Sequence, residues 1–248
     1  MRGSLVDEKI KFVYDEPAMV VSAAGDEHLV VADLHIGMEL DLSHKGIHMF
    51  DATERMAARI KGIAAQFDLK SLIILGDVKN SILYPDVREI RLLRGFFKSL
   101  EDFKINVLAG NHDAHLGGIV GIEVHKELII GDMGFMHGNR KPGDEMMSLN
   151  FIVSGHEHLA VQIKEPTGAV YEQKAWAIYK LGRKAAKQEY GRFNPKLRLI
   201  SMPAFNDLIM GTVIDKDRKS RMNPLIRSSV FDSAKAEVYN LMGQRISL

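Results

Sequence analysis

The residues of this chain that could do chemistry are carboxylate, amide and imidazole side chains that follow short apolar runs. The clearest group is the tetrapeptide Gly110-Asn111-His112-Asp113, which comes directly after the apolar run 105–109. An amide, an imidazole and a carboxylate in succession rarely serve packing. Similar side chains follow four other expected strands: Asp33 with His35, Asp77, His137, and His156 with His158.

These side chains suit a pair of metal ions. Carboxylate and amide oxygens combined with imidazole nitrogens favour Mn²⁺, Fe, Zn²⁺ or Co²⁺. The Asp-x-His and His-x-His spacings put both side chains of a pair on the same face of an extended segment. Two metals roughly 3.5–4 Å apart need a bridging carboxylate and hold a water or hydroxide between them. The chain contains no Cys, which excludes thiolate ligands and disulfides.

The first half of the chain alternates apolar strands with amphipathic helices. Strands are expected over 10–14, 19–22, 28–32, 71–75 and 105–109. One helix is expected to begin with Asp51 as its N-cap and Glu54 at N3, and a second over 86–100 is expected to turn Val87 and Leu93 inward. This alternation predicts βαβ units and a sheet covered by helices. Ligands bind such a sheet at the carboxyl ends of its strands.

The second half reads as β-rich. The runs 127–130 and 134–137 predict a hairpin, and 151–154 predicts another buried strand, followed by mostly short strands. Within this half, the basic excursion 164–198 holds nine Lys and Arg against three Glu, a difference of +6. Aromatic residues are interleaved with these charges: Trp176, Tyr179, Tyr190 and Phe193.

The basic excursion has two interpretations. Basic residues with aromatics could contact a nucleic-acid backbone and stack on bases. More often such a stretch is a solvated amphipathic helix whose aromatics pack on the sheet. In either case we expect the excursion to belong to a single domain that spans residues 1–248.

Composition narrows the classes of function. The hydrophobic share of 46% is enough for a full core. There are 33 basic and 32 acidic residues, and the net charge of +1 predicts no general affinity for nucleic acid or membranes. The sequence has no pattern typical of a signal peptide or a membrane span, so we expect a cytoplasmic protein.

The motif order D-x-H, G-D, G-N-H-D, H-G, G-H-x-H resembles that of the calcineurin-like metallophosphoesterases. The resemblance covers about 125 residues, from Asp33 to His158. The stretches 29–37, 76–79 and 203–206 are similar to archaeal SbcD-related phosphoesterases, which are close to bacterial ligase-associated phosphodiesterases. The resemblance implies an α/β fold, specifically a four-layer α/β/β/α sandwich. It also implies two divalent metal ions, with Mn²⁺ the first expectation and Fe, Zn²⁺ or Co²⁺ the alternatives.

The resemblance further implies a role for each motif residue. His112 would face the phosphate and either stabilise the transition state or protonate the leaving oxygen, and Asp113 would orient His112. A hydroxide between the metals would attack phosphorus in line, with no covalent phospho-enzyme. The expected ligands of one metal are Asp33, His35 and His158. Those of the other metal are Asn111, His137 and His156. Asp77 would bridge the two metals.

Four other residues are candidates for substrate binding. Asn80 stands where related enzymes often have Asp or His, and its role could be structural instead. Arg140 follows the His137-Gly138 turn and could meet a phosphate or lie in a solvated loop. The stretch 203–206 could bring Phe205 or Asn206 near the substrate, or could only form a turn.

The expected function is a metal-dependent phosphodiesterase that acts on nucleotides or small phosphodiesters. A DNA or RNA nuclease is an alternative. The basic excursion favours it, whereas the near-neutral net charge disfavours it. A protein phosphatase is a further alternative. A non-catalytic interaction scaffold with a degraded metal site is a further alternative. The presence of all seven expected ligands and of His112 argues against a scaffold. The sequence leaves the physiological substrate, the native metal and the oligomeric state open.

Overall fold

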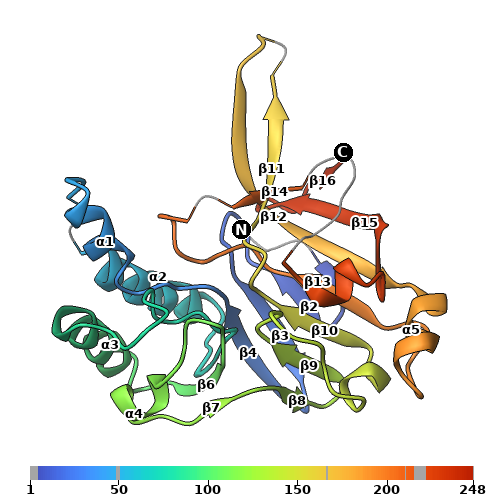
Figure 1. Ribbon diagram of the computed structural model, residues 1–248, viewed down its shortest axis with the longest axis horizontal. Coiled ribbons are helices and arrows are strands. Elements are labelled where there is room, and N and C mark those ends of the chain that lie inside the picture. The colour runs from blue at the N-terminus through green and yellow to red at the C-terminus, as the bar shows by residue number, and fades with distance from the viewer. Residues whose placement is uncertain (1–4, 49–50, 166, 210, 215–221, 248) are drawn as a thin grey trace.

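The computed structural model describes residues 5–48, 51–165, 167–209, 211–214 and 222–247. Within these residues, two β-sheets lie face to face between two layers of helices (Figure 1). The arrangement is the α/β/β/α sandwich that the sequence predicts. No helix in the described part of the chain is both long and apolar enough to span a membrane.

The first sheet has seven strands in chain order. Its first four strands form an antiparallel meander, whereas the fourth to seventh pair in parallel. The parallel part therefore delivers several strand ends to one edge of the sheet. The strands are β1 (Leu5–Asp7), β2 (Ile10–Phe12), β3 (Met19–Ala23), β4 (Asp26–Val31), β5 (Ser71–Ile74), β6 (Lys104–Leu108) and β7 (Val124–His125).

Four helices follow strands of this sheet and cover its outer face: α1 (Met38–His44), α2 (Ala52–Gln66), α3 (Val87–Ser99) and α4 (Leu116–Val120). Helix α3 is capped by Asp86, which accepts hydrogen bonds from the main-chain N–H groups of Arg88 and Glu89 at 2.9 Å. The expectation that Val87 faces inward is wrong, because this first-turn residue is 70% exposed while Phe96 is buried instead.

Helix α2 begins where the sequence predicts, but its cap is different. Asp51 has a left-handed backbone conformation and makes no side-chain cap hydrogen bond. The buried carboxylate of Glu39 in α1 takes its place, accepting from the N–H and the hydroxyl of Thr53 at 3.2 and 2.5 Å. The same carboxylate accepts from the N–H of Gly37 at 3.2 Å. Glu39 therefore joins α2 to the loop that carries Asp33 and His35.

The second sheet has nine strands in the order β14-β11-β12-β13-β10-β9-β8, with β15 beside β12 and β16 beside β15. The predicted hairpin is β8–β9, and β9, β10 and β13 run parallel. The strands are β8 (Leu128–Ile130), β9 (Met133–Met136), β10 (Phe151–Ser154), β11 (Leu159–Lys164), β12 (Val170–Leu181), β13 (Arg198–Ser201), β14 (Thr212–Val213), β15 (Phe231–Asn240) and β16 (Arg245–Ile246).

Two of these strands are longer than the sequence suggests. Strand β12 has 12 residues and β15 has 10. In Figure 1 the hairpin β11–β12 extends from the body of the molecule. Three short helical segments accompany this sheet: η1 (Met146–Ser148), α5 (Arg183–Glu189) and α6 (Pro224–Arg227).

The core consists of three clusters that correspond to the three interfaces between layers. Strand β4 illustrates why: Leu29 and Val31 face the helices, whereas Val30 faces the second sheet. Because successive side chains of a strand point to opposite faces, a strand buried on both sides must be apolar throughout. Strand β4 is therefore held on both faces, which fixes the position of Asp33 just beyond its end.

Three aromatic residues of the basic excursion are core residues, whereas Tyr171 is 45% exposed. Trp176 and Tyr179 are fully buried, on opposite sides of the second sheet, and Tyr190 packs on the same cluster as Tyr179. The packing interpretation therefore holds for Trp176, Tyr179 and Tyr190, which are not free to stack on bases.

Candidate metal centre

The carboxyl ends of parallel strands from both sheets meet at one edge, and the loops that follow them are joined by hydrogen bonds. The N–H of His35 donates to the carbonyl of Asp77 at 2.8 Å, linking the loops after β4 and β5. The N–H of His156, after β10, donates to a carboxylate oxygen of Asp33 at 3.0 Å. The two sheets thus share one set of loops, although their residues lie more than 100 positions apart in the chain.

The backbone at this edge is strained. Positive φ angles are uncommon for residues other than glycine and persist where the surrounding structure enforces them, often at functional sites. Five of the seven predicted ligands have them: Asp33 (56°), His35 (41°), Asp77 (47°), His156 (73°) and His158 (46°). The loops therefore hold these side chains in conformations that isolated segments would avoid.

Two glycines allow the loops to approach this closely. A Cβ atom on Gly110 would lie 2.2 Å from the main-chain nitrogen of Asp77, and one on Gly155 would lie 2.6 Å from a carboxylate oxygen of Asp33. Both distances are far below contact, so only glycine fits at either position. The glycines predicted beside the ligands are therefore required here by space.

The first ligand group contains Asp33, His35, Asp77 and His158. One potential ligand atom from each lies within 4.8 Å of all the others. Nε2 of His158 is 3.3 Å from the Asp33 carboxylate. Within the described residues, this Nε2 and both ring nitrogens of His35 are buried without a hydrogen bond. Buried polar atoms without partners are costly, and a cation bound by these atoms would satisfy them.

The second ligand group contains Asp77, His137 and His156, again within 4.8 Å of one another. Nδ1 of His137 lies 2.8 Å from the carbonyl oxygen of Leu75. Because a carbonyl only accepts, Nδ1 must donate, which directs the lone pair of Nε2 into the site. That Nε2 lies 3.2 Å from Oδ1 of Asn111, so Asn111 belongs to this group.

The atoms around Nε2 of His137 are mostly acceptors. Asp77 contributes a carboxylate oxygen at 3.3 Å, Asn111 an amide oxygen at 3.2 Å and His156 its Nδ1 at 3.1 Å. Facing lone pairs repel one another unless a proton or a metal ion lies between them. A divalent cation would satisfy all of them at once, and the oxygen and imidazole donors suit Mn²⁺, Fe, Zn²⁺ or Co²⁺. The residues present therefore fit a metal centre with Asp77 in both groups.

The protonation equilibria indicate the same need for positive charge. Burial opposes protonation of His137, but its hydrogen bond with Asp77 and the charges of Asp33 and Asp77 raise its pKa to about 9. Burial and the neighbouring His137 lower the pKa of His156 to about 4. Burial likewise lowers the pKa of His35 to about 4. Two of the imidazoles are thus ready to bind metal at neutral pH, while His137 must first release a proton.

Comparison with known proteins supports the fold assignment. No profile of a known protein family and no curated protein matches the sequence. Among solved structures, the nuclease MPE of Pseudomonas putida is 16% identical, and the match covers 91% of this chain and 97% of that protein with a TM-score of 0.57. The chain has the metallophosphoesterase fold.

Two other solved structures are too distant to carry an argument. Yfce, a phosphoesterase from E. coli, is 19% identical over 56% of this chain and 73% of its own, with a TM-score of 0.34. A predicted phosphoesterase from Streptococcus pneumoniae is 13% identical over 88% and 91%, with a TM-score of 0.31. The predicted sandwich is confirmed, whereas the archaeal SbcD-related subgroup stays a prediction.

Within this metallophosphoesterase fold, His112 lies beside the first ligand group, with its ring 4.8 Å from that of His35. The sequence predicts that Asp113 orients this imidazole, and that prediction is wrong. Nδ1 of His112 instead contacts the main-chain oxygen of Asn80 at 2.5 Å. Asp113 accepts from the N–H groups of Val78 and Gly110, at 2.8 and 2.9 Å. Asp113 is therefore buried behind His112 and joins the loops after β5 and β6.

Two of the four predicted substrate-binding residues lie near this edge. The side chain of Asn80 donates to Asp41 in α1 at 2.6 Å, while its main chain holds His112. Arg140 donates to the carbonyl of Ala109 at 3.2 Å, which places its guanidinium beside the Asn111 loop. Asn80 therefore contacts His112 through its backbone, whereas the guanidinium of Arg140 lies beside the loop that carries Asn111.

The other two candidates are not available to a substrate. Phe205 is fully buried, and the Arg59 guanidinium lies 4.8 Å from its ring centroid. Asn206 is also buried and donates from Nδ2 to the carbonyl of Leu34 at 2.7 Å. The prediction that these residues contact the substrate is wrong for both. Asn206 instead supports the Asp33–His35 loop from behind.

Sequence reasoning missed two buried carboxyl groups near the centre. Glu89 in α3 accepts from the N–H groups of Asn80 and Ser81, at 2.9 and 3.0 Å, and so positions the carbonyl that holds His112. Glu157 lies under the second sheet against Ser201 at 3.1 Å, and burial raises its pKa to about 7. The only signal for Glu157 in the sequence is its place between His156 and His158.

Proposed function

We propose that this chain is a divalent-metal-dependent phosphoester hydrolase that prefers phosphodiesters of nucleotides or similar small molecules. The observation that carries the proposal is the pair of adjoining ligand groups that share Asp77. A carboxylate common to two metal positions is what a dinuclear hydrolytic centre needs.

The seven predicted ligands would hold the metals in two sets. Asp33, His35 and His158 would bind one, Asn111, His137 and His156 the other, and Asp77 would contact both. Divalent cations in such a site polarise phosphoryl oxygens and make water a stronger nucleophile at neutral pH. The support for this assignment is that six of these residues converge in two groups, each within 4.8 Å, and that Oδ1 of Asn111 lies 3.2 Å from Nε2 of His137.

His112 would act on the leaving group. Since Nδ1 donates to the Asn80 carbonyl, the proton that can be exchanged with a substrate is on Nε2. A protonated Nε2 can donate a hydrogen bond to a phosphoryl oxygen or transfer its proton to the leaving oxygen. Arg140, beside the Asn111 loop, would contribute a fixed positive charge to the phosphate.

A nuclease is the second candidate. The solved structure that matches with a TM-score of 0.57 is described as a nuclease, which favours a nucleic-acid substrate for this chain as well. Against this, Trp176, Tyr179 and Tyr190 of the basic excursion are buried and cannot stack on bases, although Tyr171 is 45% exposed. We therefore place small phosphodiesters first and nucleic-acid ends second.

The preference between diester and monoester tests the proposal. Metal-stripped protein reloaded with Mn²⁺ is assayed on bis(p-nitrophenyl) phosphate and on p-nitrophenyl phosphate under the same conditions. We expect a higher kcat/KM for the diester, and an equal or lower value would contradict the preference. A labelled single-stranded oligonucleotide in the same assay distinguishes the nuclease, which would cleave it faster than either small substrate.

A further inference from the structure

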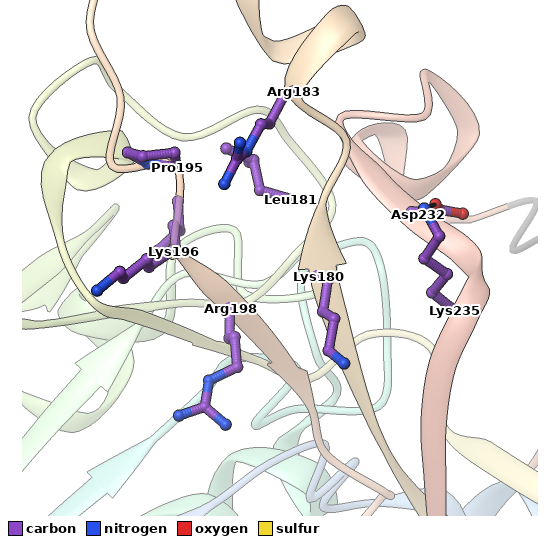
Figure 2. Close-up of a pocket in the computed structure, with 9 residues that line it drawn as sticks. Lys180, Leu181, Arg183, Pro195, Lys196, Arg198, Asp232 and Lys235 are labelled. Carbon is purple, nitrogen blue, oxygen red and sulfur yellow. Dashed lines mark ion pairs between the residues drawn. The ribbon is translucent and has the colours of Figure 1, made fainter.

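A basic cavity lies in the second sheet, away from the metal centre. It has a volume of about 420 Å³, which is within the range of small-ligand pockets. It is bounded by the end of β12, the start of β13, helix α5 and β15 (Figure 2). Its charged lining is five cations and one carboxylate: Lys180, Arg183, Lys196, Arg198, Lys235 and Asp232.

Strand register forces two of these cations together. Lys180 of β12 is directly opposite Arg198 of β13, and on its other side it is opposite Asp232 of β15. Like charges directly opposite each other across neighbouring strands destabilise a sheet. Figure 2 shows Arg183 above these two strands, with Lys180 and Arg198 below it on adjacent strands. The fold therefore brings the positive charges of Lys180, Arg183 and Arg198 to the lining of one cavity.

Neighbouring carboxylates compensate this charge only in part. Lys180 pairs with Glu237 at 3.0 Å, Arg198 with Asp7 at 3.4 Å and Lys235 with Asp232 at 3.0 Å. These pairs are partly exposed, and such pairs stabilise little. Arg183 and Lys196 form no ion pair with any residue that the structure describes. Counted with these three carboxylates, the five cations leave a net charge of +2, carried by Arg183 and Lys196.

The cavity is separate from the metal centre. Arg198 is the first residue of β13 and Ser201 is the last, and β13 runs parallel to β10. The ligand His156 follows the end of β10, whereas the cavity lies at the start of β13. The two sites are therefore at opposite edges of the second sheet, about 10 Å apart along the strands alone.

We propose that this cavity is a second binding site, specific for a phosphate group that carries more than one negative charge. Arg183 supplies a guanidinium fork that can bind two phosphate oxygens at once. Lys196 supplies a second unpaired cation, and Lys180 and Arg198 supply charge from below. A net charge of +2 matches a doubly charged phosphate better than a singly charged carboxylate.

Binding is measured with the metal centre emptied by EDTA, so that it cannot contribute. Inorganic pyrophosphate is titrated calorimetrically, and a fluorescent single-stranded oligonucleotide is titrated by anisotropy. We expect Arg183→Glu and, separately, Lys196→Glu to weaken binding about tenfold or more. Lys184→Glu and Lys187→Glu are the matched controls, because they make the same charge change on α5 outside the cavity. We expect them to change affinity less than about twofold.

The two ligands distinguish the source of the phosphate. Arg183-dependent binding of pyrophosphate alone supports a site for a small phosphate compound, and dependence for both ligands supports a site for a nucleic-acid backbone. Failure of both ligands to bind would overturn the proposal, as would equal weakening by Lys184→Glu. Diester hydrolysis of the Mn²⁺-loaded Arg183→Glu variant should equal that of the unaltered chain, so the outcome is independent of the proposed hydrolase activity.

Discussion

The Nδ1 atom of His112 lies 2.5 Å from the main-chain oxygen of Asn80. This contact joins the loop after β6 to the loop after β5 and fixes which ring nitrogen carries the permanent proton. His112 is therefore held beside the ligand groups by a backbone carbonyl, without being required to bind metal itself.

Removal of the His112 imidazole should separate catalysis from metal binding. We expect His112→Ala to keep both metals and to lose about 10²–10⁴-fold in kcat, the usual contribution of general acid catalysis. Metal content by elemental analysis and kcat on the diester check this. His28→Ala, a buried histidine near the start of β4 and so at the end of that strand opposite Asp33, is the matched control and should leave both quantities unchanged. Loss of metal in His112→Ala would show that our assignment of its role is wrong.

Glu89 should affect the reaction only through Asn80 and His112. Its carboxylate accepts from the N–H groups of Asn80 and Ser81, so Glu89→Ala should release the loop and lower kcat about tenfold while metal content stays constant. Glu89→Gln keeps the accepting oxygen and should restore most of the activity. The pH profile of kcat should also shift in Glu89→Ala, because the contact of His112 is altered. Equal effects of both substitutions would point to a structural role instead.

Metal affinity should rise with pH. The pKa of His137 is raised to about 9, so below that pH the metal-free imidazole is protonated and must lose a proton when metal binds. The apparent dissociation constant should therefore increase about tenfold for each unit of pH lowered from about 8 to 6. Titrations in buffers with different heats of ionisation should show proton release on binding. A dissociation constant that is independent of pH in this range would contradict the assignment of His137.

Phe205 should matter for stability and not for substrate binding. It is fully buried among helix and sheet residues, so Phe205→Leu should lower the free energy of unfolding by about 1–3 kcal/mol. KM for the diester should be unchanged in the variant at a temperature where it is folded. A several-fold increase in KM would restore Phe205 as a substrate contact.

The sequence located the segments that carry the candidate ligands, because hydrolytic metal sites depend on residue type at strand ends. Strand β10 was located without error, and β4, β5 and β6 to within two residues at either end, since strands buried on both faces read as continuous apolar runs. Asp33, Asp77 and His137 follow such strands. The order of their motifs, which resembles that of the metallophosphoesterases, predicted which residues would share a metal.

The failures concern groups whose partners lie far away in the chain. Asp113 adjoins His112, yet it contacts Val78, which lies 35 positions earlier. The cap of α2 comes from Glu39 in a preceding helix, and Phe205 faces Arg59 at a distance of 146 positions. Local spacing carries no information about such contacts. The same limit applies to the cavity at Lys180 and Arg198, which depends on strand register.

The most direct test of the hydrolase is a titration of metal-stripped protein with Mn²⁺, with diester hydrolysis and bound metal measured in the same samples. We predict no hydrolysis without metal, and activity that saturates as about two ions bind per chain. Asp77→Asn, which alters the carboxylate common to both ligand groups, should bind less metal and stay inactive in the same titration. Hydrolysis by the metal-stripped chain, or full activity in Asp77→Asn, would contradict the dinuclear centre.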